Sequence, residues 1–245
     1  PCYHCFIQFL TDMSLELQYY ASLLEIVTLS IKNMNVLIVL AGNPPSKTLL
    51  KTEMATTDLI IAVDGGFNVF HKYNLDPDLV LGDMDSANME NVGSIDVIPL
   101  LDQALTDLQK TLEYVFETQP VKSLTFLGGV GDRTDHLLHN LYICSSIDPQ
   151  MKIIFKNELP PDNDISLEII QRITPECDFD LRVTQGNTLS ILPITDFGGL
   201  NSLGLEWEIV NQNHSQGFIS QSNLVNKADL TFTIRSGCAY IAVYQ

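Results

Sequence analysis

The most informative acidic spacing in the chain is Gly-Asp-Met-Asp-Ser at residues 82–86. It follows the apolar residues 79–81, so we expect a buried strand to end where the acids begin. Residues two apart in an extended chain point the same way, which would place the Asp83 and Asp85 carboxylates roughly 7 Å apart, repelling each other by roughly 2.4 kcal/mol. Mg²⁺ would remove this repulsion, because it takes one or two carboxylates and holds a phosphate substrate. The alternative is an acidic turn in which Asp85 or Ser86 caps the next helix.

A second acidic turn follows the apolar residues 59–63, where Asp64 is succeeded by Gly65 and Gly66. We expect Asp64 to end this strand as Asp83 ends the next one. Ligands of parallel α/β sheets bind at the carboxyl ends of the strands, so both acids are expected at one edge of the sheet.

A third acid, Asp107, is expected in the first turn of a helix. Thr106 and Gln109 have the spacing of a capping box, which predicts that the helix begins there, and Gln103 lies just before it. Asp107 could contribute to a metal site. The alternative is that it only complements the helix dipole, as first-turn acids commonly do.

A glycine-rich loop follows the predicted strand at residues 123–127. The loop contains Gly128, Gly129, Gly131 and Arg133. Such a turn at a helix N-terminus offers backbone N–H groups to an anion, and arginine adds a bidentate donor for phosphate. The loop matches neither the Walker A nor the dinucleotide pattern, so it predicts only a phosphate site. Asp135 could cap the helix or bind metal or substrate, whereas His136 and His139 are interpreted as hydrogen-bonded helix residues rather than bases.

Strands and helices are expected to alternate through residues 34–160. The predicted strands are residues 35–42, 59–63, 79–81, 95–98, 123–127 and 152–155. Helix-like segments between them are typical of a mostly parallel sheet covered on both faces. We therefore predict an α/β domain of α/β/α type, preceded by an N-terminal extension, residues 1–33, whose role is not evident.

The pattern changes after a linker-like segment at residues 157–164. Short segments then alternate apolar and polar residues, with apolar positions at Leu205, Trp207, Ile209, Leu230, Phe232 and Ile234. This pattern predicts an antiparallel β-sandwich domain over residues 161–245. A strand at residues 217–223 would place Ser220 and Ser222 on one face, where they could orient a polar aromatic ligand or simply face water.

Charge and cysteine content exclude several classes of protein. The formal net charge of −17 argues against nucleic acid and favours cationic small molecules or metal-bridged anions as ligands. Acidic residues interrupt the apolar N-terminal segment, so no membrane span or membrane partner is expected. The five cysteines are Cys2, Cys5, Cys144, Cys177 and Cys238. Their odd number and scatter favour reduced thiols and a cytoplasmic protein, and the Cys2–Cys5 pair lacks a second pair at zinc spacing.

The order of these motifs resembles the thiamine pyrophosphokinase (thiamine diphosphokinase) family. The motifs are Asp64-Gly65-Gly66, Pro77-Asp78, Asp83-Met84-Asp85-Ser86, Gln103 with Thr106-Asp107, and Arg133-Thr134-Asp135-His136 with Asn140. The resemblance extends from about Met34 to the C-terminus and includes Gly204-Leu205-Glu206-Trp207 and residues 220–223, similar to the family's thiamine-binding domain. Asp132 departs from it, since the family often has glycine there.

The resemblance implies transfer of a pyrophosphoryl group from ATP to the hydroxyl of thiamine, with AMP as the second product. It implies Mg²⁺ ligands and catalytic groups at Asp83, Asp85 and Asp107, with Arg133 also catalytic. It implies ATP contacts at Asp64, Gly65, Gly66, Gly128, Gly129, Gly131 and Arg133. It implies thiamine contacts at Gln103, Thr106, Asp135, Ser220, Ser222 and Asn223, and a homodimer with composite sites.

Two other functions fit the same residues. One is a different Mg²⁺-dependent phosphotransferase or nucleotidyltransferase, which its products would distinguish. The other is a non-catalytic sensor of thiamine or nucleotide, against which the complete set of Asp83, Asp85, Asp107 and Arg133 counts.

Overall fold

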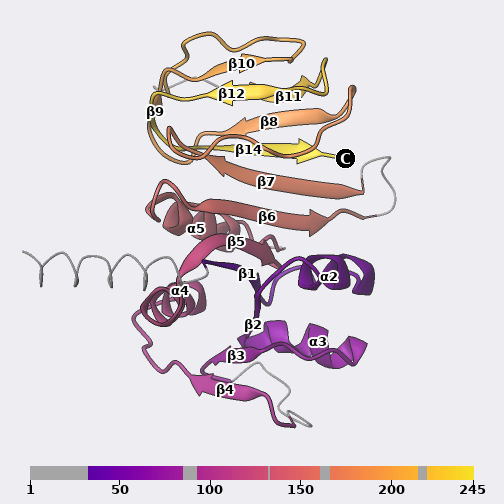
Figure 1. Cartoon of the computed structure of the whole chain (residues 1–245), viewed down its shortest axis with the longest axis vertical. Coiled ribbons are helices and arrows are strands. Elements are labelled where there is room, and N and C mark those ends of the chain that lie inside the picture. Colours follow the sequence, from indigo (N-terminus) through magenta and orange to yellow (C-terminus); the bar gives the residue numbers. More distant parts are fainter. Residues whose placement is uncertain (1–32, 85–92, 132, 161–165, 215–219) are drawn as a thin grey trace, which may run out of the picture. The chain divides into compact units, whose positions relative to one another are not determined.

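The computed structural model describes residues 33–84, 93–131, 133–160, 166–214 and 220–245. Within these residues a central sheet is built from β1 (Met34–Val39), β2 (Leu59–Val63), β3 (Leu79–Gly82), β4 (Asp96–Pro99), β5 (Val121–Leu127), β6 (Lys152–Glu158), β7 (Leu167–Ile173), β8 (Thr188–Leu192), β11 (Ser220–Leu224) and β14 (Ala239–Tyr244). The strand order is β11-β8-β14-β7-β6-β5-β1-β2-β3-β4 (Figure 1). The extension predicted at residues 1–33 lies almost wholly outside the described residues.

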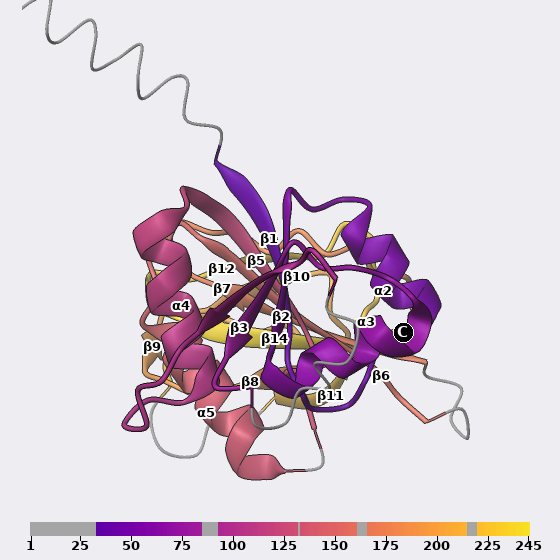
Figure 2. The same cartoon turned by 90° about the horizontal axis from the view of Figure 1, so that it is seen from below.

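The six strands β1 to β6 pair in parallel, as the alternating sequence pattern predicts. The helices between them are α2 (Lys47–Met54), α3 (Phe67–Tyr73), α4 (Asp107–Thr118) and α5 (Thr134–Ser145). Figure 2 shows α4 and α5 on one face of the sheet and α2 and α3 on the other. Accordingly residues 36–39 of β1 are buried on both faces. In the described part of the chain, no helix has the length and apolar character needed to cross a membrane.

Local signals in the sequence set the starts of two helices. The hydroxyl of Ser46 accepts a hydrogen bond from the backbone N–H of Leu49 and caps α2. The capping box of Thr106 and Gln109 is present at the start of α4, as predicted, and Asp107 is the first residue of that helix.

The antiparallel strands β7, β14, β8 and β11 continue the same sheet. Two small sheets, β9 (Phe197–Gly198) with β13 (Ser236–Gly237) and β10 (Asn201–Leu203) with β12 (Thr231–Thr233), complete this half. Strand β14 alternates between two cores: Tyr240 and Ala242 join the core that contains α5, while Ile241 and Val243 join the core that contains β12. The two halves are therefore joined by a shared sheet.

The predicted linker at residues 157–164 is partly wrong. Asn157 and Glu158 are the last residues of β6 and pair with Glu168 and Leu167 of β7, and residues 161–165 lie outside the described part. The strands β6 and β7 are therefore antiparallel neighbours, and the predicted linker overlaps the end of β6. The domain boundary at residue 160 stays a prediction.

The predicted strand through Trp207 is also wrong. Leu205 and Ile209 are buried, but Trp207 is 61% exposed and residues 206–210 have no strand pairing. The reason is a turn: the side chain of Asn223 accepts from the N–H of Trp207 at 3.2 Å and donates to its carbonyl at 2.7 Å. These two side-chain hydrogen bonds take the place of the strand-to-strand backbone hydrogen bonds that the alternating pattern predicts.

Arg172 joins the two halves on the α5 side of the sheet. Its side chain is fully buried in β7. Its guanidinium donates to the carbonyl oxygens of Cys144, Ile147, Asp148 and Met151 at 2.8, 2.7, 2.6 and 2.7 Å. It thereby satisfies the C-terminal end of α5, whose other end begins at the glycine-rich loop.

We expect Arg172→Met to lower the free energy of unfolding by about 3 kcal/mol, because buried carbonyl groups lose a charged donor while the apolar stem is retained. Arg182→Met removes the same charge from an exposed side chain and is expected to change stability by less than about 0.5 kcal/mol. Urea unfolding of both variants measures the difference, and equal stability of the two would show that the carbonyl contacts contribute nothing.

Candidate active site

A cavity of about 480 Å³ opens at the carboxyl ends of the parallel strands. The predicted site residues that line it are Asp64, Asp83, Gln103, Thr106, Asp107, Gly128, Gly129, Gly131 and Arg133. They come from four separate stretches of sequence, which the topology brings to one edge of the sheet. His136, His139 and Asn140, at the start of α5, also line the cavity.

The glycine-rich loop is held close to the segment that follows β1. Gly128 has φ +66°, and a Cβ there would lie 2.2 Å from the Leu40 carbonyl oxygen. A Cβ on Gly42 would lie 2.3 Å from the Gly128 carbonyl oxygen, which accepts a 3.0 Å hydrogen bond from the Gly42 N–H. Asn140 donates to the Gly129 carbonyl at 2.9 Å. The loop is therefore fixed by backbone contacts that leave no space for side chains at Gly42 or Gly128.

Asp64 directly follows β2, in the turn of residues Asp64–Gly66, and has a strained conformation. It is buried and has φ +44°, which is uncommon for a residue other than glycine. Its Cβ would lie 3.0 Å from a Cβ added to Gly82. Gly65 and Gly66 are not among the lining residues of the cavity, and a Cβ on Gly66 would lie 2.1 Å from the Val39 carbonyl oxygen. These contacts indicate that Gly66 shapes the turn that holds Asp64.

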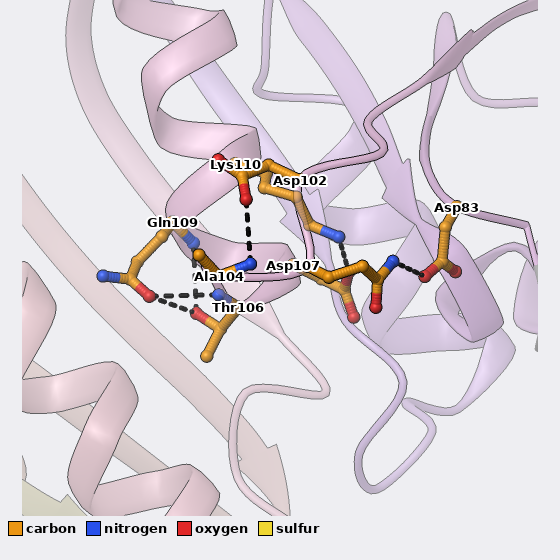
Figure 3. A network of polar contacts seen from close by, with 8 residues as sticks. Asp83, Asp102, Ala104, Thr106, Asp107, Gln109 and Lys110 are labelled. Atoms are coloured by element: carbon orange, nitrogen blue, oxygen red, sulfur yellow. Dashed lines mark hydrogen bonds and ion pairs between the residues drawn. The ribbon is translucent and has the colours of Figure 1, made fainter.

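A polar network surrounds the start of α4 (Figure 3). Gln103 donates from its side-chain amide to the Asp83 carboxylate at 3.3 Å. Asp107 forms a 2.8 Å ion pair with Lys110, whose side chain is only 6% exposed. Burial alone would lower the pKa of Lys110, but the hydrogen bond with Asp107 and the charges of Asp107, Asp83 and Asp64 outweigh it, so this pKa lies above its usual value.

Lys110 is a residue of this site that the sequence did not predict. Its spacing from Asp107 does not mark it as a site residue, because an acid and a lysine three residues apart are a common pair on helix surfaces. Only the packing of α4 against the sheet buries this ammonium beside the cavity, and spacing along the chain does not reveal that.

Arg133 and Asp135 form an exposed ion pair of 2.6 Å at the start of α5. The hydrogen bond from Arg133 lowers the pKa of Asp135 to about 2, so this carboxylate is charged at neutral pH. Arg133 lines the cavity, whereas Asp135 is not among its lining residues.

The predicted thiamine contacts on β11 form a separate group at the edge of the sheet. Asn223 is buried and holds Trp207, as described above, while Ser222 is exposed with φ +55° beside a register shift between β11 and β8. Bulges of this kind re-aim side chains and are frequent beside functional sites. None of Ser220, Ser222 and Asn223 lines the cavity.

The cavity has residues suited to Mg²⁺. Asp83 and Asp107 both line it, and carboxylates with room for water and phosphate are what this ion prefers. Within the described ranges no group of three or more His, Cys, Asp or Glu side chains is arranged to hold a metal. Asp85, the third predicted ligand, and Asp132 lie outside the described residues.

The fold and the cavity together define a class of protein. In this class an α/β sheet carries carboxylates and a glycine-rich loop suited to anions at the carboxyl ends of its strands, and antiparallel strands extend the sheet. Two family models match the chain: "Thiamin pyrophosphokinase, catalytic domain" over residues 50–155 and "Thiamin pyrophosphokinase, vitamin B1 binding domain" over residues 173–239. The chain belongs to the thiamin pyrophosphokinase family. The family resemblance, the fold class and thiamine diphosphokinase activity predicted from the sequence are thereby confirmed.

Individual relatives agree with this assignment. The chain is 26% identical over 186 residues to thiamin pyrophosphokinase 1 of Caenorhabditis elegans, covering 69% of this chain and 72% of that protein. The solved structure of thiamine pyrophosphokinase from Bacillus subtilis superposes with a TM-score of 0.67 at 21% identity, covering 86% of this chain and 99% of the other. The solved structure of yeast thiamin pyrophosphokinase superposes with a TM-score of 0.68 at 18% identity, covering 87% of this chain and 86% of the other. These structures show a shared fold.

Proposed function

We propose that ATP is the donor and that its terminal pyrophosphoryl group passes to the hydroxyl of thiamine. The hydroxyl oxygen bonds to the β-phosphorus, the bond from that phosphorus to the oxygen bridging the α-phosphate breaks, and AMP leaves. The hydroxyl proton passes to water or a carboxylate. The observation that best supports this reaction is a single cavity lined by Asp83 and Asp107 and also by the glycine-rich loop with Arg133.

The chain's own groups position the triphosphate. Gly128, Gly129 and Gly131 let phosphate oxygens approach the backbone N–H groups closely. Arg133 donates to phosphate oxygens from an exposed position at the start of α5. Positioning and charge stabilisation suffice for phosphoryl transfer, so no covalent nucleophile is required.

We assign Mg²⁺ to Asp83 and Asp107, with Asp85 as the third ligand expected from the sequence. The bound ion would neutralise charge that develops on the triphosphate. Asp64, buried at the end of β2, contributes a further negative charge to the wall of the cavity.

The site is proposed to be composite, built by two chains. In the order of the sheet, β11 lies five strand spacings from β5 and eight from β3. Figure 1 shows the paired strands that lie between them. At about 4.8 Å per strand spacing, β11 is about 24 Å from β5 and about 38 Å from β3. A small substrate that touches both β11 and the cavity therefore requires β11 from a second chain.

Exposed apolar side chains support a homodimer. On the α/β half these include Leu101, Leu138 and Tyr142, at 70, 50 and 64% exposure. On the β half they include Leu203, Trp207 and Val210, at 60, 61 and 76%. Side chains of this size on both halves suit a two-fold contact in which each half meets the other chain. The apolar spacing of α5 predicts that Leu138 faces inward with Leu137 and Leu141, but its side chain belongs to this exposed set.

Trp207 and the polar edge of β11 suit thiamine. An exposed indole face attracts a flat cationic ring, and the hydroxyls of Ser220 and Ser222 can hydrogen-bond to its polar atoms. The net charge of −17 adds a long-range attraction for a cation.

Incubation with thiamine and Mg-ATP, followed by chromatography of both products, tests the proposed reaction. We expect thiamine diphosphate and AMP in equal amounts. ADP with thiamine monophosphate would overturn the assignment, and calorimetric binding of thiamine without turnover would indicate a sensor instead.

We also propose a cytoplasmic location. Within the described residues Cys144, Cys177 and Cys238 are buried free thiols. Burial raises the pKa of Cys144 to about 12, so this group is an unreactive thiol that suits a reducing compartment.

A further inference from the structure

Lys110 is the one cation buried in the wall of the cavity among the described residues. It lies one turn into α4, is 6% exposed, and contacts Asp107 at 2.8 Å. Asp64 and Asp83 line the same cavity. The ammonium therefore lies among the carboxylates to which Mg²⁺ is assigned above, and the inference drawn here rests on that assignment.

The buried ammonium of Lys110 affects the charge of the cavity as well as the packing of α4. Removing a charged group from water is unfavourable unless partners compensate, and lysines are almost never fully buried unless paired. Asp107 already receives support from the N-terminal end of α4, where an acid complements the helix dipole. Lys110 adds to this support through its ion pair with Asp107, and its charge also makes the net charge of the cavity less negative.

Two cations then share one set of carboxylates. An ammonium a few Å from a divalent ion repels it, which weakens binding of the free ion. Mg²⁺ that arrives on a triphosphate brings at least an equal negative charge with it, so the repulsion is offset.

We propose that Lys110 is a positioning residue that holds Asp107 and tunes the cavity to admit Mg²⁺ together with the triphosphate rather than alone. Lys110 is the counter-charge of the carboxylates when no ion is bound. It is not a metal ligand and does not touch the reacting atoms.

Calorimetric titration with Mg²⁺ alone, without nucleotide or thiamine, tests this role. Lys110→Met removes the charge and keeps the stem, and we expect it to bind Mg²⁺ about tenfold more tightly than the parent, as loss of one nearby unit charge predicts. The rise in melting temperature on adding Mg²⁺ should be larger in this variant. Turnover should nevertheless fall by about tenfold, because Asp107 loses the donor that orients it.

Three comparisons make the result specific. Lys110→Arg keeps the charge and should restore an Mg²⁺ affinity near that of the parent. Lys51→Met makes the same charge change at an exposed site on α2 and should leave Mg²⁺ binding unchanged. Lys110→Gln replaces the methionine variant if that protein is insoluble.

Unchanged or weaker Mg²⁺ binding by the Lys110→Met and Lys110→Gln proteins would overturn the proposal, since it would make Lys110 an ordinary support of Asp107. Failure of the proposed function is a separate result, because the parent would then form no thiamine diphosphate from thiamine and Mg-ATP.

Discussion

Asp83→Asn is expected to lower turnover by at least about a hundredfold while the fold stays intact, because the substitution removes a charged metal ligand from the cavity. Asparagine keeps an oxygen that can accept the 3.3 Å hydrogen bond from Gln103, so local packing is preserved. The melting temperature should not fall, since the loss of one carboxylate relieves repulsion with its neighbours. Steady-state rates, circular dichroism and thermal unfolding measure these effects.

Asp102→Asn is the matched control for this prediction. Asp102 lies in the segment that leads into α4. It is exposed and accepts a 2.8 Å hydrogen bond from the Ala104 N–H. It is not among the lining residues of the cavity, so turnover should stay within a few fold of the parent. Equal rates for Asp83→Asn, Asp102→Asn and the parent across a Mg²⁺ titration would contradict the metal assignment.

The positions of the site residues were predictable where strand ends fix them. Asp64 and Asp83 follow apolar runs, and parallel pairing of those runs necessarily brings both acids to one edge of the sheet. The capping box of Thr106 and Gln109 fixed the start of α4 in the same local way. Such features depend on a few neighbouring residues, which is why spacing alone identifies them.

Other features depend on contacts between distant segments and could not be predicted. The burial of Lys110 requires α4 to pack against the sheet. The turn at Trp207 requires the side chain of Asn223, sixteen positions away in sequence. Alternation of apolar residues likewise predicted β12 but not the turn at Trp207, and it says nothing of which strands pair, so it could not show that β7 continues the parallel sheet through β6.

Co-expression of two inactive chains is expected to restore activity if the site is composite. The first chain carries Asp83→Asn in the cavity. The second carries Ser222→Arg, which places a bulky cation on the exposed edge of β11 and repels thiamine. In a mixed dimer one site combines both defects and the other has neither, so random assembly should give about a quarter of the parent activity.

A pair of defects in one half of the chain is the control for that experiment. Co-expressed Asp83→Asn and Asp107→Asn chains should show no rescue, because each chain brings a damaged cavity to every dimer. Mass measurement must demonstrate mixed dimers in both cases. If mixed dimers of the Asp83→Asn and Ser222→Arg chains form and stay inactive, each site lies within one chain. The separation of about 24 Å between β11 and β5 would then require the β11 residues to act on something other than the substrate in the cavity.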